Sequence, residues 1–401
     1  MADRRPAVAL YHHLPPGGAH RAMYELTRRT SERYRYVLFE VVPSDRDPFE
    51  GTDQAPLADV VDEVHRIKAP VGGAGQLRRW TRAIPALERV ERRIAREIAK
   101  LPAAVTVVHH QRFLQAPALM HHVACPTLYV AQEPRRRSFE YDLRHPKKRG
   151  ALRRIAELPL DLLDAWARHH DLSATRAATE IVCNSQYSRE TIWRSYGRDA
   201  TIIPFGADKD LFVLPTDNAR DPEVLAVGSL DPSKGHDLAI AAIAQIPESI
   251  RPRLRIVHNR SAPGYADSIM AAATELGVDL SLESGINDSA LVERYQRAAA
   301  VIATARLEPL GLTPLEAMAC GTPVVAVNEG GYRETITPGV TGALVDRSPA
   351  ALSEALCEVL RSSGTTNRAA IRDHAAKSWS WDLGAERYAS VLDGLVDQTI
   401  S

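Results

Sequence analysis

Segments of strand length and segments of helix length alternate along almost the whole chain. Strand-like apolar runs lie at 7–11, 36–42, 105–109, 127–130, 181–184 and 201–203, and again at 224–227, 254–257, 280–282, 300–303, 324–327 and 342–345. Helices are expected between them, the longest over about 149–178. Such alternation is typical of parallel sheets covered by helices on both faces. The sequence therefore predicts an α/β fold of the doubly wound type, in which ligands bind at the carboxyl ends of strands.

The length of 401 residues favours two domains, because single hydrophobic cores stop growing near ~250–300 residues. The stretch from Pro204 to Asp221 is irregular and contains a Pro-Phe-Gly sequence. We therefore predict a first domain over 1–204, a linker over 205–221 and a second domain from residue 222.

The composition excludes several classes of protein. The four cysteines are widely spaced and form no CxxC pair, so neither a zinc site nor a disulfide scaffold is indicated. The N-terminus lacks the long apolar stretch of a signal peptide, and no apolar run approaches the ~20 residues that cross a bilayer. A cytoplasmic location without a structural metal is expected.

The charges are balanced overall but unevenly distributed. Residues 1–204 carry 33 Lys and Arg against 24 Asp and Glu, and the remaining residues carry the opposite excess. A basic half attracts anionic ligands, lipid head groups or nucleic acid. An ordinary solvated basic surface is the alternative.

The segment 300–321 carries the most informative pattern. A buried strand leads into a loop with Glu308 and Gly311, and a helix follows. The sequence Thr313-Pro-Leu-Glu316 predicts a capping box, with Thr313 as the cap and Glu316 three residues later. Unpaired amides and the helix dipole suit a diphosphate over Gly311, Leu312 and Thr313. Glu308 follows a strand, where ligands bind in such folds, although a surface-loop acid is the alternative.

The run Glu308-Pro-Leu-Gly-Leu-Thr-Pro-Leu-Glu316, followed by Ala-Met-Ala-Cys-Gly-Thr-Pro-Val-Val-Ala326, resembles the signature of retaining glycosyltransferases of family 4. The segments 329–335 and 339–345 resemble the next helix and strand of that family. The resemblance implies the GT-B fold, with two facing Rossmann-like domains. It assigns the acceptor domain to 1–204, the sugar-nucleotide donor domain to 222–378, and a helix that crosses back to 379–401.

The resemblance also implies roles for residues of the donor domain. Glu308 would hold sugar hydroxyls and Glu316 the ribose, in addition to its capping role. Lys234, which follows Gly228-Ser229-Leu230, would bind the diphosphate together with the amides of Gly311, Leu312 and Thr313. Ser229 occupies the position of the family's usual second phosphate ligand, an arginine, and Arg306 or Arg260 would replace it. Ile286, within 284–287, would face the base.

In the first half, Gly17-Gly18 resembles the family's glycine loop beside the donor phosphate and the acceptor. The run Val107-Val-His-His-Gln111 resembles the segment that holds a histidine near the transferred sugar. His109 is preferred for this role over His110, and an ordinary loop histidine is the alternative for each. The predicted catalytic residues are therefore Glu308, His109 and Lys234.

A basic segment over 135–154 contains nine Lys and Arg and two acids. It indicates an anionic acceptor or peripheral contact with an anionic membrane, where each basic residue contributes about 1 kcal/mol. The alternative is a solvated surface, and nucleic acid is not expected because no recognised module is present. Glu133, Arg135 and His110 are the candidate acceptor residues.

The predicted function is transfer of a sugar from a nucleoside diphosphate sugar to a glycan, a lipid-linked or a small-molecule acceptor, with retention and without a metal or other cofactor. The alternative is a non-catalytic GT-B protein that binds a sugar nucleotide and supports a partner enzyme.

Overall fold

The computed structural model describes residues 3–14, 17–43, 57–69, 82–139, 151–362 and 367–400, with the side chains of Arg137, 151–160 and Ile400 excluded. The chain divides into two compact units. Unit 1 consists of residues 1–184, 188–203 and 385–401, and unit 2 of residues 185–187 and 204–384. The domain roles that the sequence assigns to 1–204, 205–221, 222–378 and 379–401 stay predictions.

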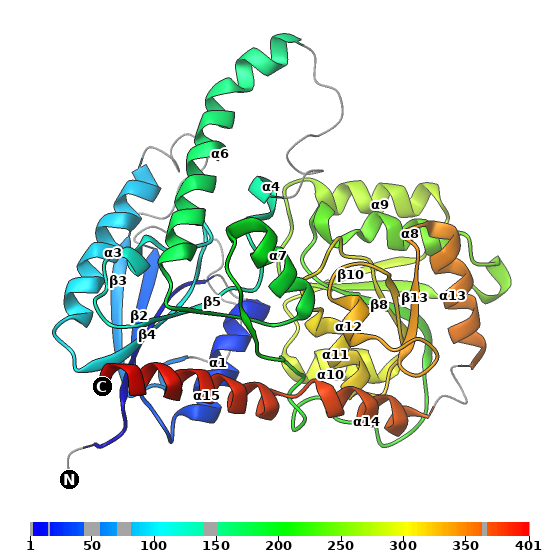
Figure 1. The fold of residues 1–401 in the computed structure, drawn as a ribbon. Helices are drawn as coiled ribbons and strands as arrows, with labels where there is room; N and C mark the ends of the chain where they lie inside the picture. Colours follow the sequence, from blue (N-terminus) through cyan, green and yellow to red (C-terminus); the bar gives the residue numbers. More distant parts are fainter. Residues whose placement is uncertain are drawn as a thin grey trace. The chain divides into compact units, whose positions relative to one another are not determined.

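Unit 1 is built on one parallel sheet of seven strands in the order β3-β2-β1-β4-β5-β6-β7 (Figure 1). The strands are β1 (Ala7–His13), β2 (Arg35–Pro43), β3 (Glu63–Ala69), β4 (Ala103–Gln111), β5 (Thr127–Val130), β6 (Glu180–Cys183) and β7 (Thr201–Ile202). The helices are α1 (Gly18–Thr30), α3 (Ile84–Ile98), α4 (Arg136–Phe139), α6 (Ala151–Ala177) and α7 (Gln186–Tyr196). Helix α15 (Trp381–Ile400) begins in unit 2 and belongs to unit 1 from Ala385 onward.

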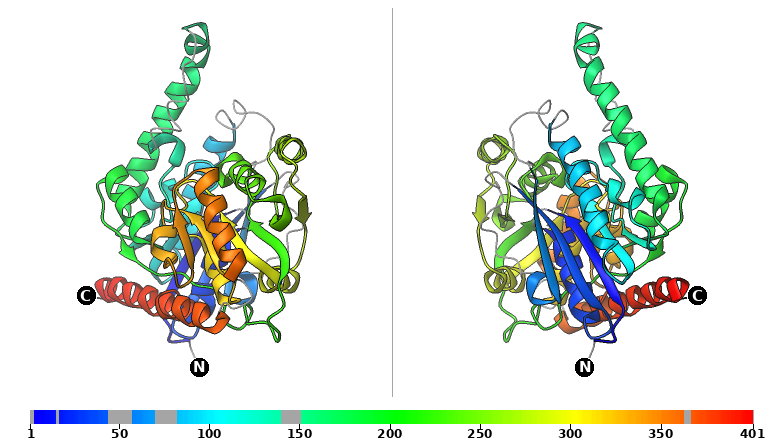
Figure 2. Two further views of the ribbon diagram at one scale, coloured as in Figure 1. Left: turned by 90° about the vertical axis from the view of Figure 1, so that its right-hand side faces the viewer. Right: turned by 90° about the vertical axis from the view of Figure 1, so that its left-hand side faces the viewer.

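Unit 2 has a second parallel sheet, of six strands in the order β10-β9-β8-β11-β12-β13. The strands are β8 (Asp221–Val227), β9 (Arg253–His258), β10 (Leu280–Ser284), β11 (Ala298–Ala303), β12 (Val324–Val327) and β13 (Gly342–Val345). The helices are α8 (His236–Ala244), α9 (Tyr265–Glu275), α10 (Asp288–Arg297), α11 (Leu312–Ala319), α12 (Tyr332–Thr335), α13 (Pro349–Ser362) and α14 (Arg368–Ser378). Helices lie on both faces of each sheet (Figure 2), which confirms the predicted doubly wound architecture.

Buried central strands explain why the sequence predicts most of the sheet. Every residue of β1 and of β11 is buried, and strands covered on both faces have continuous apolar runs. Strand β3 lies at the edge of the first sheet, and its residues range from exposed to buried. No apolar run in the sequence predicts β3, because charged and polar residues alternate with its apolar ones.

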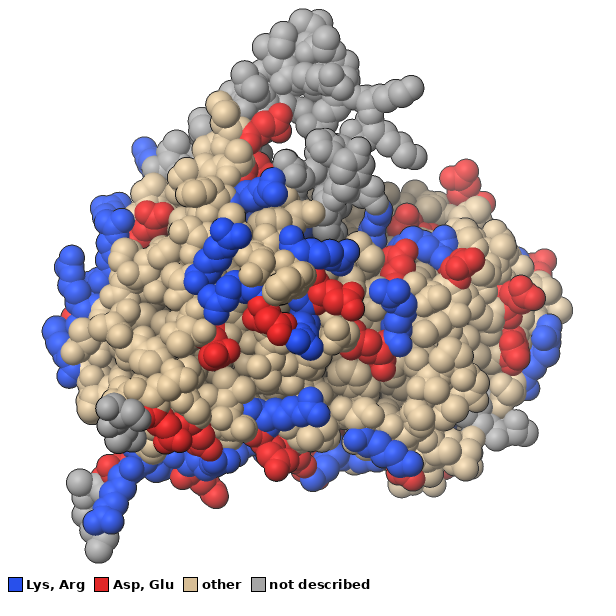
Figure 3. Space-filling view, viewed as in Figure 1, with Lys and Arg blue, Asp and Glu red and all other residues tan. Residues whose placement is uncertain are grey.

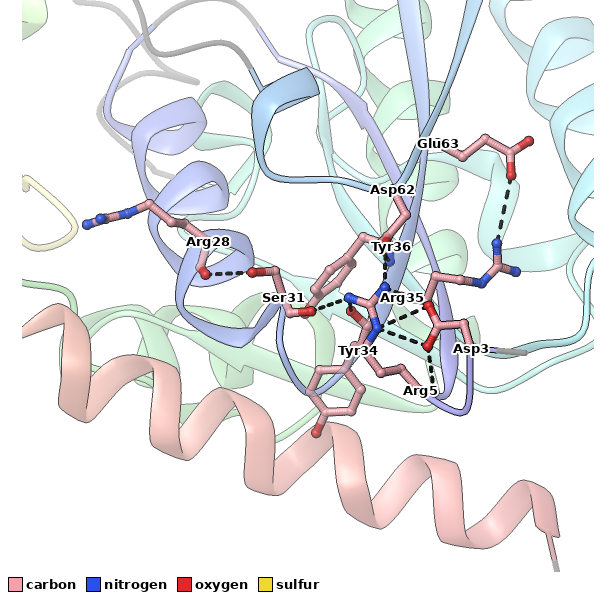
Figure 4. A network of polar contacts seen from close by, with 9 residues as sticks. All are labelled: Asp3, Arg5, Arg28, Ser31, Tyr34, Arg35, Tyr36, Asp62 and Glu63. Atoms are coloured by element: carbon pink, nitrogen blue, oxygen red, sulfur yellow. Dashed lines mark hydrogen bonds and ion pairs between the residues drawn. The ribbon is translucent and has the colours of Figure 1, made fainter. Parts of the chain in front are cut away.

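A polar network joins the amino ends of β1, β2 and β3 in unit 1 (Figure 4). The Arg5 guanidinium, just before β1, donates to both Asp3 and Asp62. Asp62, just before β3, also accepts from the backbone amide of Tyr36 in β2 at 2.9 Å. Arg5 donates in addition to the carbonyl of Ser31, after α1. The amino ends of three strands and the end of one helix are therefore held together at this edge.

Charged side chains of both signs are intermingled on the face shown in Figure 3. The described residues on this face therefore do not gather into a surface of one sign, although residues 1–204 carry an excess of Lys and Arg.

A buried carboxyl group in the core of unit 1 makes stability depend on pH. The Glu91 carboxyl, on α3, accepts from the Tyr11 hydroxyl at 2.7 Å and from the Gln111 amide at 3.2 Å. It is fully buried, and burial raises the pKa of Glu91 to about 8. The folded protein therefore keeps a proton between pH 5 and pH 8 that the unfolded chain releases, so ionisation costs stability as the pH rises.

We expect Glu91→Gln to reduce this loss of stability, because glutamine keeps the acceptor oxygen and cannot ionise. Urea unfolding at pH 5 and pH 8 should show a fall in wild-type unfolding free energy that exceeds that of the variant by on the order of 3 kcal/mol. Glu97→Gln, at a partly exposed position on the same helix where the carboxylate pairs with Lys100, is the control. An identical pH dependence in the wild type and Glu91→Gln would contradict this prediction.

Candidate functional site

The chain order reverses between β8 and β11, the two adjacent central strands of unit 2. Connections from these strands leave toward opposite sides of the sheet, and ligands of doubly wound folds bind outside the carboxyl ends at such a switch point. Lys234 follows β8, and Glu308 and Gly311 follow β11. The structure therefore brings the predicted donor residues of two separate sequence regions to one edge.

Lys234 and Glu308 form an ion pair, with Nζ 2.8 Å from Oε2. Both side chains are partly buried. The Thr304 hydroxyl donates to the Lys234 carbonyl at 3.0 Å, and the Arg306 amide donates to the Ser233 carbonyl at 2.9 Å. The loops after β8 and β11 are therefore joined by backbone contacts as well as by the ion pair.

Close backbone approach between these loops requires a glycine after Lys234. Gly235 has a φ of +69°, and a Cβ atom built on it would lie 2.4 Å from the Thr304 carbonyl oxygen. Only glycine adopts this conformation at little cost and leaves space for the carbonyl. Gly235 also ends the short turn that carries Lys234 and precedes α8.

The predicted capping box at Thr313–Glu316 is wrong. Helix α11 begins at Leu312, its N-cap is Gly311 with a φ of +92°, and no side chain caps it. Thr313 and Glu316 consequently lie inside the helix. The Glu316 carboxylate instead accepts from the Tyr295 hydroxyl at 2.8 Å.

Glu316 is buried, with 8% of its surface exposed. Tyr295 lies near the end of α10 and is fully buried, and burial together with the Glu316 charge raises the pKa of its hydroxyl well above the usual value. The hydroxyl therefore remains a hydrogen-bond donor that fixes one carboxylate oxygen. The sequence does not reveal the contact of Tyr295 with Glu316, because no local pattern connects residues on two successive helices.

Ser229 belongs to a tightly bonded turn after β8. Its hydroxyl donates to Asp231 at 2.6 Å, and its carbonyl oxygen lies 3.1 Å from His236 Nε2. Two arginine backbones flank this turn: the Arg260 carbonyl accepts from the Leu230 amide at 2.7 Å, and Arg306 bonds to Ser233. The structure thus places both candidate replacements for the phosphate-binding arginine beside the turn, and the choice between them stays a prediction.

Ile286 follows β10, the edge strand that β9 separates from β8. The adjacent Asn287 caps α10 by accepting from the Ala290 amide at 2.9 Å. Ile286 therefore lies at the same carboxyl edge of the sheet as Lys234 and Glu308. Its role beside the base stays a prediction.

Unit 1 has its own switch point, between β1 and β4. Gly17 is the N-cap of α1 and Gly18 its first residue. A register shift between β1 and β4 sets His109 and His110 of β4 opposite His12 alone of β1. Bulges of this kind re-aim side chains and are frequent beside active sites. The predicted glycine loop and both predicted histidines thus lie at one edge of this sheet.

These histidines are held in the neutral form. Burial lowers the pKa of His109 to about 3 and that of His110 to about 4. His12, which is also buried, accepts from the Leu14 amide through Nδ1 at 3.3 Å, so its proton is assigned to Nε2. The sequence does not single out His12, although it directly follows the predicted strand 7–11, and the bulge sets it opposite His109 and His110.

The predicted acceptor residues have structural contacts of their own. The Glu133 carbonyl accepts from the Gln115 amide at 3.0 Å. Arg135 forms an ion pair with Asp164 of α6 and donates to Ser138. Residues 140–150 of the basic segment, and the side chains of Arg137, Arg153 and Arg154, lie outside the described residues.

Within the described ranges, no group of three or more His, Cys, Asp or Glu side chains is arranged to hold a metal ion. None of the helices in the part of the chain that the structure describes is long and apolar enough to cross a bilayer.

Comparison with known proteins identifies the class of fold. Sucrose-phosphate synthase from Thermosynechococcus elongatus superposes with a TM-score of 0.77 at 19% identity, over 98% of this chain and all of that one. The Anabaena protein HepE, solved with UDP and glucose, gives a TM-score of 0.71 at 17% identity, over 96% of this chain and 99% of that one. The fold is that of the GT-B glycosyltransferases.

The sequence of unit 2 matches a family of glycosyltransferases. Residues 210–378, somewhat less than half of the chain, match the family "Glycosyl transferases group 1". D-inositol 3-phosphate glycosyltransferase from Xylanimonas cellulosilytica is 30% identical over 240 residues, 54% of this chain and 56% of that protein. The chain spans about half the length of the curated relatives it matches.

Proposed function

We propose that this chain transfers a sugar from a nucleoside diphosphate sugar to an acceptor, with retention at the anomeric carbon. The observation that carries the proposal is the Lys234–Glu308 pair at the switch point of the unit that matches the group 1 glycosyltransferases. An ammonium group beside a helix start offers a site for a diphosphate, and the neighbouring carboxylate offers one for sugar hydroxyls.

Each predicted residue has a role that its contacts support. Lys234 and the amides at the start of α11 stabilise the charge that develops on the leaving diphosphate. Glu308 accepts hydrogen bonds from sugar hydroxyls. The positive charge of Lys234 lies between the Glu308 carboxylate and the phosphates and reduces the repulsion between them. Glu316, fixed by Tyr295, accepts from the ribose hydroxyls. Catalysis would then depend on alignment and on stabilisation of the leaving group, without a paired acid and base.

The histidines of unit 1 suit an uncharged hydroxyl partner. A neutral imidazole offers one N–H donor and one acceptor nitrogen, and a hydroxyl group can satisfy either. We assign His109, with His110 as the alternative, to hydroxyl groups of the reacting sugar or the acceptor. Their lowered pKa values keep this capacity throughout the physiological pH range.

The test is release of nucleoside diphosphate by the purified protein. UDP-glucose and GDP-mannose are each incubated with acceptors that include sugars, inositol, inositol phosphate and phosphatidylinositol vesicles. We expect release that depends on one donor and one acceptor, and a product with the anomeric configuration of the donor. A product of inverted configuration would contradict retention. Calorimetric donor binding without turnover across the panel would favour the alternative of a non-catalytic sugar-nucleotide-binding protein.

Vesicles with and without anionic lipid also test the basic segment. Cosedimentation that requires anionic lipid would support peripheral membrane contact, and its absence would contradict it.

A further inference from the structure

The loop between β11 and Glu308 is held by side chains from the two neighbouring strands of the sheet. Arg347 follows β13, and its guanidinium donates to the Thr304 carbonyl at 3.0 Å and to the Glu329 carboxylate at 2.8 Å. Glu329 follows β12, and its other oxygen accepts from the Leu307 amide at 3.4 Å. Arg347 and Glu329, here called the brace, therefore hold the loop at two backbone positions.

The brace acts on a strained part of the chain. Leu307 has a φ of +48°, a left-handed conformation that leucine adopts only at an energetic cost. Such a conformation persists only when its surroundings stabilise it. Residues with strained backbones are concentrated at functional sites. The amide bound by Glu329 is that of Leu307 itself.

The next residue along the chain is Glu308. Its carbonyl accepts from the Gly331 amide at 2.7 Å, and its carboxylate pairs with Lys234 at 2.8 Å. The brace fixes the backbone before Glu308, and the Gly331 amide fixes the backbone after its Cα atom. The direction of the Glu308 carboxylate therefore depends on the brace. The hydrogen bonds of the brace are made to the backbone of Thr304 and Leu307, and not to this carboxylate.

We propose that Arg347 and Glu329 are positioning residues that aim Glu308 at the transferred sugar and thereby make the site prefer a nucleoside diphosphate sugar over the bare nucleoside diphosphate. The inference rests on the proposed function. It predicts a particular defect: loss of the brace weakens recognition of the sugar, while the diphosphate and ribose contacts of Lys234, α11 and Glu316 remain.

The experiment compares calorimetric dissociation constants for UDP and UDP-glucose, and for GDP and GDP-mannose, in the wild type and four variants. Arg347→Ala and Glu329→Gln remove the brace ion pair in different ways, so each checks the other if one folds poorly. Arg347→Lys keeps the positive charge without the two-pronged guanidinium. Arg297→Ala breaks an ion pair with Asp221 at the amino end of β8 and serves as the control.

We expect Arg347→Ala and Glu329→Gln to change nucleoside diphosphate binding less than about twofold and to weaken nucleotide-sugar binding about tenfold, with kcat reduced by a similar factor. Arg347→Lys should recover part of the loss, and Arg297→Ala should bind both ligands like the wild type. If binding of the nucleoside diphosphate and of the nucleotide sugar weakened equally, or if neither changed, the inference would be overturned and the proposed function would stand. A wild type that binds neither ligand would overturn the proposed function and the inference with it.

Discussion

Replacement of Glu308 by alanine is expected to reduce sugar transfer about 10²–10³-fold while nucleoside diphosphate binding persists, because a positioned charged group near the reacting sugar contributes by this order. The carboxylate that would hold the sugar is lost, but Lys234, its partner at 2.8 Å, remains and no longer shares its charge. Binding of the bare diphosphate should therefore be unchanged or tighter. Initial rates of nucleoside diphosphate release and calorimetric titration with the diphosphate measure the two effects separately.

Glu308→Gln is the matched variant, because it keeps the size of the side chain and an oxygen that can accept from Lys234. Its transfer rate should fall between those of the wild type and Glu308→Ala. Glu293→Ala, at an exposed position on α10, is the control and should be fully active. Full activity in Glu308→Ala would remove Glu308 from the site.

Gly235→Ala should have the largest effect on the integrity of the donor site. The added Cβ atom would lie 2.4 Å from the Thr304 carbonyl oxygen, and the backbone at φ +69° is unfavourable for alanine. The turn that carries Lys234 must then move away from the end of β11, where the Thr304 hydroxyl now bonds to the Lys234 carbonyl. We expect a loss of about 3–4 kcal/mol in unfolding free energy and at least a tenfold loss of diphosphate binding.

Gly264→Ala is a closely matched control. Gly264 is also the N-cap of a helix in unit 2 and has a φ of +73°, but a Cβ atom there would meet nothing within 4 Å. Its replacement should cost only the backbone term of about 1–2 kcal/mol and leave diphosphate binding intact. Urea unfolding and calorimetry of both variants make the comparison. Equal losses of stability would show that the contact with Thr304 contributes nothing.

Local sequence pattern predicts the sheets and the place of the site. The runs at 127–130 and 324–327 are strands with the predicted bounds, because buried parallel strands are continuously apolar. The run at 342–345 also has its predicted bounds, as a partly buried edge strand. The 27-residue helix α6 also lies within its predicted range. The sequence predicts Glu308 and Lys234 as site residues because each follows a strand within a family-like motif, and in a parallel sheet both must reach the same edge.

The failures concern residues that depend on distant partners. Thr313-Pro-Leu-Glu316 has the spacing of a capping box, but the carboxylate of Glu316 bonds to Tyr295, 21 residues earlier in the chain. The contacts of Arg347 with Thr304 and Glu329 join the ends of three strands, and no spacing along the chain reveals them. The bulge that pairs His12 with both His109 and His110 is likewise a property of two strands together.

A crystal structure of the wild-type protein with UDP or GDP would show where the donor binds. We expect the nucleotide at the carboxyl ends of β8 and β11, with the ribose at Glu316 and the diphosphate between Lys234 Nζ and the amides of Gly311, Leu312 and Thr313. A nucleotide bound elsewhere, with neither Lys234 nor Glu316 in contact, would contradict this expectation.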